Sequence, residues 1–289
     1  MFKKFKVFYL LLIVAFLVTA CGTKDLTQGK SAQEIIEESY EKQLNIENYD
    51  MDLAMDMKMP MPEGEIMAIA MTGKATVFQK PMQMKLVVEI TNPETSEPVV
   101  IEQYMEATEQ GINIYEYVEE QWFKIVLNDP ALAETMNMDP TQNVELFLKY
   151  LKETNIIGEE KLGQRDTLKI ELVASSEMYN ELMEQIPGMN LNQPGMEITP
   201  DFLSQMGDMK YIVWVDKTTL DIVKTSMDLT ENMQNMGKAL IEQGLIPAEL
   251  AEMFSNMEMS MTYEILNINK AEPIVIPEEA KNAPELPMN

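Results

Sequence analysis

Histidine is absent from this 289-residue sequence. Histidine is the commonest general base, the commonest metal ligand and the side chain whose charge changes near neutral pH. The residue that usually performs these three roles is therefore missing. The G-x-S-x-G motif, the S-x-x-K motif with its partner motifs and the phosphate-binding glycine loop are absent as well. The sequence therefore predicts a protein that is not an enzyme and that carries no cofactor.

Cysteine occurs once, at Cys21, so no disulfide can form within the chain and packing must hold the fold. The residues before it have the order of a secretory signal peptide: three lysines within the first six residues, an apolar run over residues 7–18, and the small pair Thr19-Ala20. Leu17-Val18-Thr19-Ala20-Cys21 resembles the bacterial lipobox. That resemblance implies that Cys21 receives a diacylglyceryl thioether, such as a palmitate-bearing one, and becomes the first residue after cleavage.

Two acyl chains hold a protein firmly on a bilayer. We therefore expect the protein at the cell membrane, anchored through Cys21 on the extracytoplasmic face. Three alternatives remain open. An ordinary signal peptide would leave Cys21 incidental, a transmembrane helix would need about 20 apolar residues, more than this run supplies, and a free thiol would be a liability in an exported protein.

Basic residues are scarce: 22 Lys and Arg stand against 48 Asp and Glu, which gives a net charge of −26. Loss of the first 20 residues, with their three lysines, lowers the net charge to −29. Such a charge repels phosphate backbones and anionic lipid headgroups. We therefore expect no nucleic-acid partner, and the acyl chains, not adsorption, must hold the protein at the membrane.

No low-complexity linker divides the 269 residues that remain, which are enough for one large domain. We expect a signal peptide over residues 1–20, a flexible spacer over 21–30, one domain over 31–276 and an extended tail over 277–289. Ser31 and Glu34 form a capping box, which predicts a helix that begins at Ala32 and runs to about Ile46.

After this helix the apolar period changes from about 3.6 residues to 2, which is typical of strands with one buried face. Six strands joined by short connections are predicted in a row, at residues 49–59, 66–79, 82–90, 99–107, 112–118 and 122–127. Five more are predicted at residues 156–162, 167–174, 209–215, 220–229 and 257–265, with helices between the strand groups at residues 140–151, 176–186, 200–206, 231–243 and 247–254. We expect an α+β fold in which about eleven antiparallel strands bury their apolar faces under helices.

Methionine is frequent, with 27 residues. It is flexible and polarisable, fills irregular space and adapts to varied partners. The apolar faces of the long strands carry many of them, and these we expect to line a ligand cavity: Met51, Met55, Met57, Met59, Met67, Met71, Met82, Met84, Met257, Met259 and Met261. Such a wall can repack around a flexible guest, whereas ordinary core filling beneath the helices is the alternative.

The lipobox, the leading helix, the long alternating strands and the segment Trp214-Val215-Asp216-Lys217-Thr218-Thr219-Leu220-Asp221-Ile222-Val223-Lys224 together resemble the lipoprotein-carrier superfamily. This superfamily comprises the LolA-like and LppX-like proteins and uncharacterised Gram-positive lipoproteins of the same shape. The resemblance covers residues 31–276. It implies a strongly curved antiparallel sheet, an unclosed half-barrel, whose concave face is covered by helices and encloses an apolar cavity for acyl chains. It transfers no binding residue by identity.

These observations together predict a membrane-anchored extracytoplasmic lipoprotein that binds or carries a lipid or other apolar ligand in a methionine-rich cavity. The segment over residues 187–199 combines two prolines and two glycines with the apolar side chains Met189, Leu191 and Met196. We predict that it forms a lid over the cavity mouth. An ordinary surface loop is the alternative.

A Cu(I)-binding protein is a second hypothesis, because Met55-x-Met57-x-Met59-x-Met61 and Met257-x-Met259-x-Met261 offer soft thioethers. Neighbours on one face of a strand lie about 7 Å apart, so another strand or a bend at Pro60 would have to help.

A third hypothesis is a sensor or interaction module that presents an acidic face to an unidentified protein partner. Asp50, Asp52 and Asp56 belong to that face of the first strand. They lack the Asp-x-Asp-x-Asp-Gly loop of calcium sites, so a solvated acidic face explains them.

Overall fold

The computed structural model describes residues 24–61, 66–91, 98–118, 120–128, 140–178, 181 and 204–286. Cys21 lies outside these ranges, and so do Met189, Leu191 and Met196. The predicted lipidation and the predicted lid therefore stay predictions. Most of the two helices predicted at residues 176–186 and 200–206 also lies outside the described ranges.

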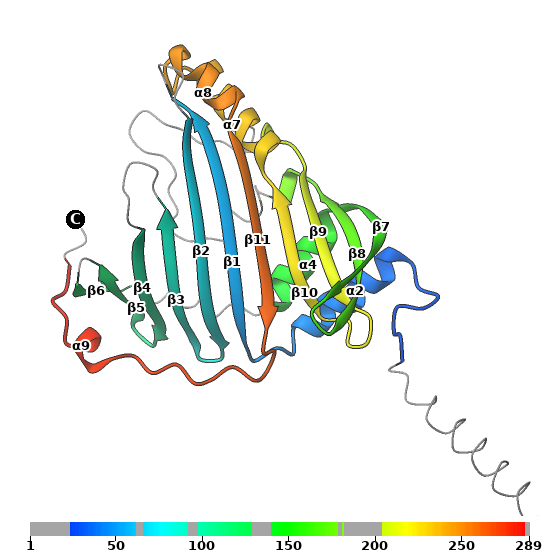
Figure 1. Ribbon diagram of the computed structural model, residues 1–289, viewed down its shortest axis with the longest axis horizontal. Helices are drawn as coiled ribbons and strands as arrows, with labels where there is room; N and C mark the ends of the chain where they lie inside the picture. The colour runs from blue at the N-terminus through cyan, green and yellow to red at the C-terminus, as the bar shows by residue number, and fades with distance from the viewer. Residues whose placement is uncertain are drawn as a thin grey trace, which may run out of the picture.

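One antiparallel sheet of eleven strands forms the body of the protein, in the order β6-β5-β4-β3-β2-β1-β11-β10-β9-β8-β7 (Figure 1). One side consists of consecutive strands: β1 (Asn48–Pro60), β2 (Ile66–Gln79), β3 (Met82–Thr91), β4 (Val99–Thr108), β5 (Gly111–Val118) and β6 (Gln121–Leu127). The other side consists of β7 (Leu151–Leu162), β8 (Arg165–Ala174), β9 (Met209–Asp216), β10 (Ile222–Asp228) and β11 (Glu258–Leu266). The predicted six-stranded meander and the unclosed α+β sheet are confirmed, since β6 and β7 end the sheet without pairing with each other.

The two sides of the sheet meet where the first strand pairs with the last. β1 and β11 run antiparallel from the pair Asp50 and Leu266 to the pair Lys58 and Glu258. β2 flanks β1 on its other edge over its whole length. The centre of the sheet is therefore built from β2, β1, β11 and β10, and it includes β1, the strand richest in methionine among those described.

The described helices are α2 (Ala32–Gln43), α4 (Pro140–Tyr150), α7 (Thr230–Glu242), α8 (Ala251–Ser255), α9 (Glu278–Lys281) and the 3-10 turn η2 (Ala248–Leu250). The predicted capping box is confirmed at α2: the Ser31 hydroxyl accepts from the Glu34 backbone N–H, and the Glu34 carboxylate accepts from the Ser31 N–H at 2.8 Å. α2 and α4 lie behind the sheet in Figure 1, whereas α7 and α8 lie at the upper ends of β11 and β1.

The main hydrophobic core lies between α2, α4 and strands β8 to β10. Ile35 and Ile36 of α2 are fully buried, and so are Ile170 and Leu172 of β8. The Tyr40 ring of α2 lies 4.6 Å from the Phe147 ring of α4. These two helices therefore seal one half of the sheet face that they cover.

The boundary between α4 and β7 differs from the prediction. Leu151 was expected on the apolar stripe of a helix, but α4 ends at Tyr150 and Leu151 begins β7, paired with Ala174. Its side chain still packs against the main core. An apolar residue next to a helix satisfies both patterns, so periodicity alone did not locate the boundary.

The C-terminal segment also differs from the extended tail expected over residues 277–289. It forms the one-turn helix α9, and Ile276 and Ala280 pack on Tyr104 and Tyr115 of the meander. Beyond α9, the Leu286 N–H donates to the Lys124 carbonyl of β6 at 2.8 Å. The segment thus covers part of the free edge of β6, which otherwise offers unpaired backbone groups to other chains.

Candidate functional site

The two faces of the central strands differ sharply in chemistry. Along β1, Met55 and Met57 are half-buried, whereas Asp52, Asp56 and Lys58 are exposed. Side chains alternate between the two faces of a strand, so the methionines share one face and the charged groups share the other. The expected separation of the two faces is therefore present.

Strand register brings the methionines of neighbouring strands together. Met55 of β1 is directly opposite Met71 of β2 and Met261 of β11, and Met261 is opposite Met227 of β10. These four form what we call the central row. Two shorter rows lie toward the upper ends of the strands: Met57 opposite Met259, and Met59 opposite Met67. We call these eight residues together the methionine face.

The methionine face continues the surface that α2 and α4 cover. Tyr211 of β9 is opposite Met227 and therefore extends the central row by one strand. Its ring lies 5.7 Å from the ring of Phe147 on α4. The central row therefore begins next to α4, so the methionines lie on the same face of the sheet as the helices α2 and α4.

All eleven methionines predicted to line a cavity are described, and ten of them are half-buried. Seven belong to the methionine face. Met51 lies two residues before Leu53 and four before Met55 on the same face, opposite Ile265 and Ala75. Met82 and Met84 lie apart, in a cluster with the buried residues Met105 and Ile112.

Met257 is the buried exception, with 6% of its surface exposed. It precedes β11, and its carbonyl accepts from the Gln234 side-chain amide of α7 at 3.0 Å. The prediction missed Met227 and Tyr211. The alternation over residues 220–229 contained the signal for Met227, but only the register shows that it joins the central row.

The covered part of this face is poorly solvated. Burial raises the pKa of the Tyr40 hydroxyl well above its usual value, and nearby Tyr263 and Tyr211 add to the rise. Burial also raises the pKa of Tyr49, with Tyr263 again contributing. Desolvation disfavours the ionised phenol in both cases. Both tyrosines are therefore neutral phenols at physiological pH and suit an apolar neighbour.

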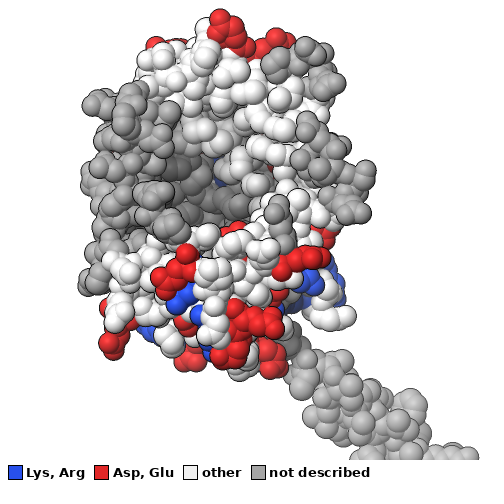
Figure 2. All heavy atoms as spheres, turned by 90° about the vertical axis from the view of Figure 1, so that its left-hand side faces the viewer, with Lys and Arg blue, Asp and Glu red and all other residues white. Residues whose placement is uncertain are grey.

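Figure 2 looks at the β6 side of the molecule and shows that this side is hollowed at its centre. Charged side chains gather at the lower end of the view, whereas the upper described part is mostly uncharged. The hollow and the mostly uncharged part of the described surface therefore lie on the same side of the protein.

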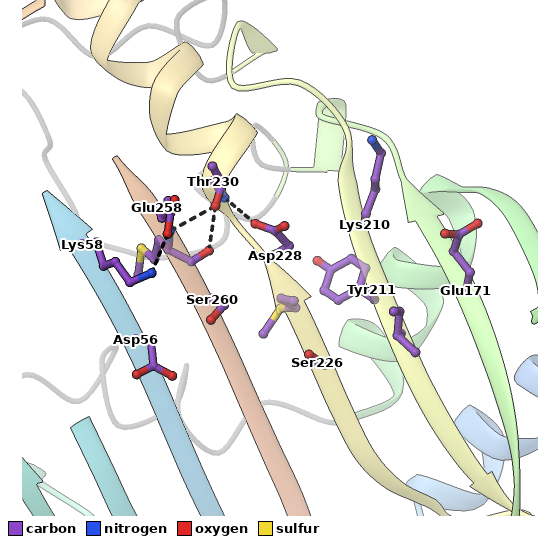
Figure 3. Close-up of a pocket in the computed structure, with 13 residues that line it drawn as sticks. Asp56, Lys58, Glu171, Lys210, Tyr211, Ser226, Asp228, Thr230, Glu258 and Ser260 are labelled. Atoms are coloured by element: carbon purple, nitrogen blue, oxygen red, sulfur yellow. Dashed lines mark hydrogen bonds and ion pairs between the residues drawn. The ribbon is translucent and has the colours of Figure 1, made fainter. Parts of the chain in front are cut away.

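A separate pocket of about 590 Å³ lies on the charged face, below the start of α7 (Figure 3). Its lining residues are Asp56, Lys58, Glu171, Lys210, Tyr211, Ile212, Ser226, Met227, Asp228, Thr230, Glu258, Met259 and Ser260. The Lys58 ammonium lies 2.9 Å from the Glu258 carboxylate, whose hydrogen bond raises the pKa of Lys58. Asp228 accepts from the Thr230 N–H at 3.0 Å.

Most residues that line this pocket are polar or charged, and its nearest opposite charges are already paired. The ion pair of Lys58 and Glu258 is exposed, so it contributes little to stability and is screened by salt. Of the eleven predicted lining methionines, only Met259 borders the pocket. Met227 and Tyr211, which the register places in line with the central row, border the pocket as well.

Two further properties concern metals and membranes. Within the described ranges, no three His, Cys, Asp or Glu side chains come together in a way that could hold a metal ion. Among the helices of the same ranges, none is long and apolar enough to cross a bilayer.

Solved structures with a similar arrangement include two mycobacterial proteins. LprF from Mycobacterium bovis is 12% identical, with 86% of this chain and 97% of that chain covered and a TM-score of 0.47. The lipoprotein LppX from Mycobacterium tuberculosis is 13% identical, with 85% and 98% covered and a TM-score of 0.44. A LolA superfamily protein from Nitrosomonas europaea is 12% identical, with 86% and 96% covered and a TM-score of 0.20. LppX-like and LolA-like proteins, the groups that the sequence resembles, are thus both among them.

A search of curated proteins found no match. The profile of one family covers residues 31–285, almost the whole of the chain beyond the predicted spacer. By this match the chain belongs to DUF6612, a family of unknown function.

Proposed function

We propose that the protein is a lipoprotein of the cell envelope, anchored through Cys21, that binds or carries a lipid or other apolar ligand on its methionine face. The observation that carries the proposal is the half-buried state of Met71, Met55 and Met261 on three adjacent strands. A surface that only filled a core would be closed, as it is beneath α2 and α4, where Ile170 and Leu172 are fully buried.

The size of the hydrophobic effect is sufficient for such binding. Each methylene group removed from water contributes about 0.8 kcal/mol, so a chain of about ten methylenes contributes about 8 kcal/mol. This exceeds the lower estimates for the cost of association, about 4 kcal/mol. Binding therefore needs no fixed polar contact, and a flexible thioether wall accepts chains of different shape.

No chemical step belongs to the proposed function. The described residues offer neutral, poorly solvated phenols at Tyr40 and Tyr49 and thioethers on the methionine face. Neither group is an activated nucleophile or a base near neutral pH. We propose a binding protein or carrier and not an enzyme.

The ligand proposal is tested with the chain from residue 22, purified from cells and examined by native mass spectrometry. We expect co-purifying lipid, and after its removal we expect uptake of a fluorescent fatty acid. Met55→Gln keeps the side-chain length but places an amide on the apolar face, so we expect about tenfold weaker uptake. Asp56→Asn changes the next residue, on the opposite face, and should leave uptake unchanged. Absence of both co-purified lipid and fatty-acid uptake would refute ligand binding.

The anchor is tested separately in cells. Cys21→Ala removes the sulfur that would receive the diacylglyceryl group, so the protein should leave the membrane fraction and lose the mass of the lipid. Membrane association of Cys21→Ala at the wild-type level would refute the anchor and leave the ligand proposal untouched.

A further inference from the structure

The methionine face holds potential ligand atoms for a metal as well as apolar surface. In the central row, Met71, Met55 and Met261 are consecutive cross-strand neighbours, and Met227 follows on the next strand. Residues directly opposite each other on adjacent strands have Cβ atoms about 4.5–5.5 Å apart. This is closer than the roughly 7 Å between same-face neighbours along one strand. Neighbouring strands therefore supply the proximity that a single strand lacks.

Structural demand alone does not explain four methionines in one row. Strands favour β-branched and aromatic residues, and the same face carries such residues one row away. There, Leu53 is opposite Tyr263, and Tyr263 is opposite Thr225. The change from this mixed row to an all-methionine row happens within two residues along each strand, on the same sheet and the same face.

The chemistry of the surroundings favours a soft metal. The carboxylates of Asp52 and Asp56 lie on the opposite face of β1 and are exposed. In the part of the chain that the structure describes, no histidine, cysteine or carboxylate cluster competes for a metal. A set of donors made only of thioethers selects Cu(I) over the harder divalent ions.

We propose that Met71, Met55 and Met261, which lie on three adjacent strands, form a binding site for one Cu(I) ion. This site goes beyond the binding of an apolar ligand and does not depend on it. Because Met71, Met55 and Met261 are half-buried, the site admits the ion from solvent and partly shields it from water. Thioethers carry no proton at any physiological pH, so binding of Cu(I) releases none.

The test uses the chain from residue 22, which lacks the Cys21 thiol, freed of lipid and titrated under anaerobic conditions. Cu(I) is generated with ascorbate, and the protein competes for it with the chromogenic chelator bicinchoninate. We expect one Cu(I) per chain, X-ray absorption that shows sulfur neighbours only, and the same affinity between about pH 5.5 and pH 8. The X-ray absorption spectrum separates this site from a carboxylate site, which would show oxygen neighbours. Oxygen or nitrogen neighbours, or weaker binding at low pH, would overturn the proposal.

Leucine variants separate the metal site from the apolar face. Leucine is close to methionine in volume and is also apolar, but it has no sulfur, so the fold should be retained while the metal donor is lost. Met55→Leu removes the donor between Met71 and Met261, and we expect at least tenfold weaker Cu(I) binding. The triple variant Met55→Leu, Met71→Leu, Met261→Leu should lose it.

Met178→Leu is the matched control, because Met178 is buried against α4 and outside the central row. It should bind Cu(I) as the wild type does. Equal Cu(I) affinity of the wild type and the triple variant would overturn the metal site, whatever the outcome of the fatty-acid experiment. If the wild type bound Cu(I) but took up no fatty acid, the proposed function alone would be refuted.

Discussion

One face of one sheet contains two differently built halves. Beneath α2 and α4, Leu172 and Val213 are at most 1% exposed and pack with branched neighbours. On the methionine face, the strands follow the same alternation but leave Met55 and Met71 half-buried. Branched side chains with defined rotamers specify one packing, whereas methionine specifies packing poorly. Identical periodicity thus encodes a closed core in one half and an adaptable surface in the other, and residue type makes the difference.

The largest expected effect compares a truncation in each half. Leu172→Ala opens a cavity in a fully buried site, so we expect a loss of about 2–5 kcal/mol in the free energy of unfolding. Met71→Ala removes a side chain that is already partly solvated, so the loss should stay below about 2 kcal/mol. Urea denaturation followed by circular dichroism measures both. Equal losses would show that the methionine face is packed as tightly as the covered half.

A second prediction concerns the helices at the upper end of the methionine face. A Cβ at Gly237 of α7 would lie 2.2 Å from the Phe254 ring of α8. Gly237→Ala therefore pushes the two helices apart, and we expect a loss of about 1–3 kcal/mol in the free energy of unfolding.

Gly244→Ala is the control for that substitution. Gly244 has a φ of +71°, but a Cβ added there would meet no other atom within 4 Å, so only backbone strain of about 1 kcal/mol should follow. Thermal unfolding of the two variants separates steric conflict from strain. A smaller loss for Gly237→Ala than for Gly244→Ala would contradict the close helix contact.

The smallest expected effect is a pH dependence at the edge of the covered half. Lys152 of β7 lies 2.9 Å from Asp208, and this hydrogen bond, with a weaker one from the Ser176 N–H, lowers the pKa of Asp208. A carboxyl whose pKa is depressed in the folded state contributes stability above its unfolded pKa. That contribution is lost as the pH falls below about 4 and through the folded pKa.

Because Asp208 is partly exposed, its contribution should be only about 0.5 kcal/mol. We expect Asp208→Asn to lower the unfolding free energy by this amount at pH 7 and to have no effect near pH 2. Thermal melts at the two pH values provide the measurement. A deficit of the same size at both would assign the effect to packing and not to charge.

Much of the fold could be predicted from local pattern, because the signals are short-range. The capping box of Ser31 and Glu34 located the start of α2, and the period of two located β2 at its observed bounds. The pairing of β1 with β11 could not be predicted, since both strands alternate methionine with polar residues and many registers satisfy that pattern. The C-terminal packing was missed for another reason: Ile276 and Ala280 lie in a segment rich in proline and glutamate that has neither a helical nor a strand period.

The sequence predicted which methionines share one face of a strand, but not which methionines of neighbouring strands lie opposite each other. Alternation along β1 was enough to place Met55 and Met57 on one side of the strand. The central row exists only because β1, next to its sequence neighbour β2, also pairs with β11, which lies far along the chain and in turn pairs with β10. Met227 entered the site through this pairing alone. Tertiary register, which no local pattern specifies, decided which methionines meet.

The ladder between β1 and β11 has a consequence for how the molecule is assembled. Lys58 and Glu258, paired across it, are 200 positions apart in the chain. Contacts of such long sequence separation form late, because the entropy cost of closing a large loop precedes the stabilisation that the contacts provide. During synthesis, the pairing between β1 and β11 therefore cannot form until β11, the last strand, has been made. Premature termination before residue 258 would leave two half-sheets, each with a long unprotected edge prone to polymerise with its neighbours.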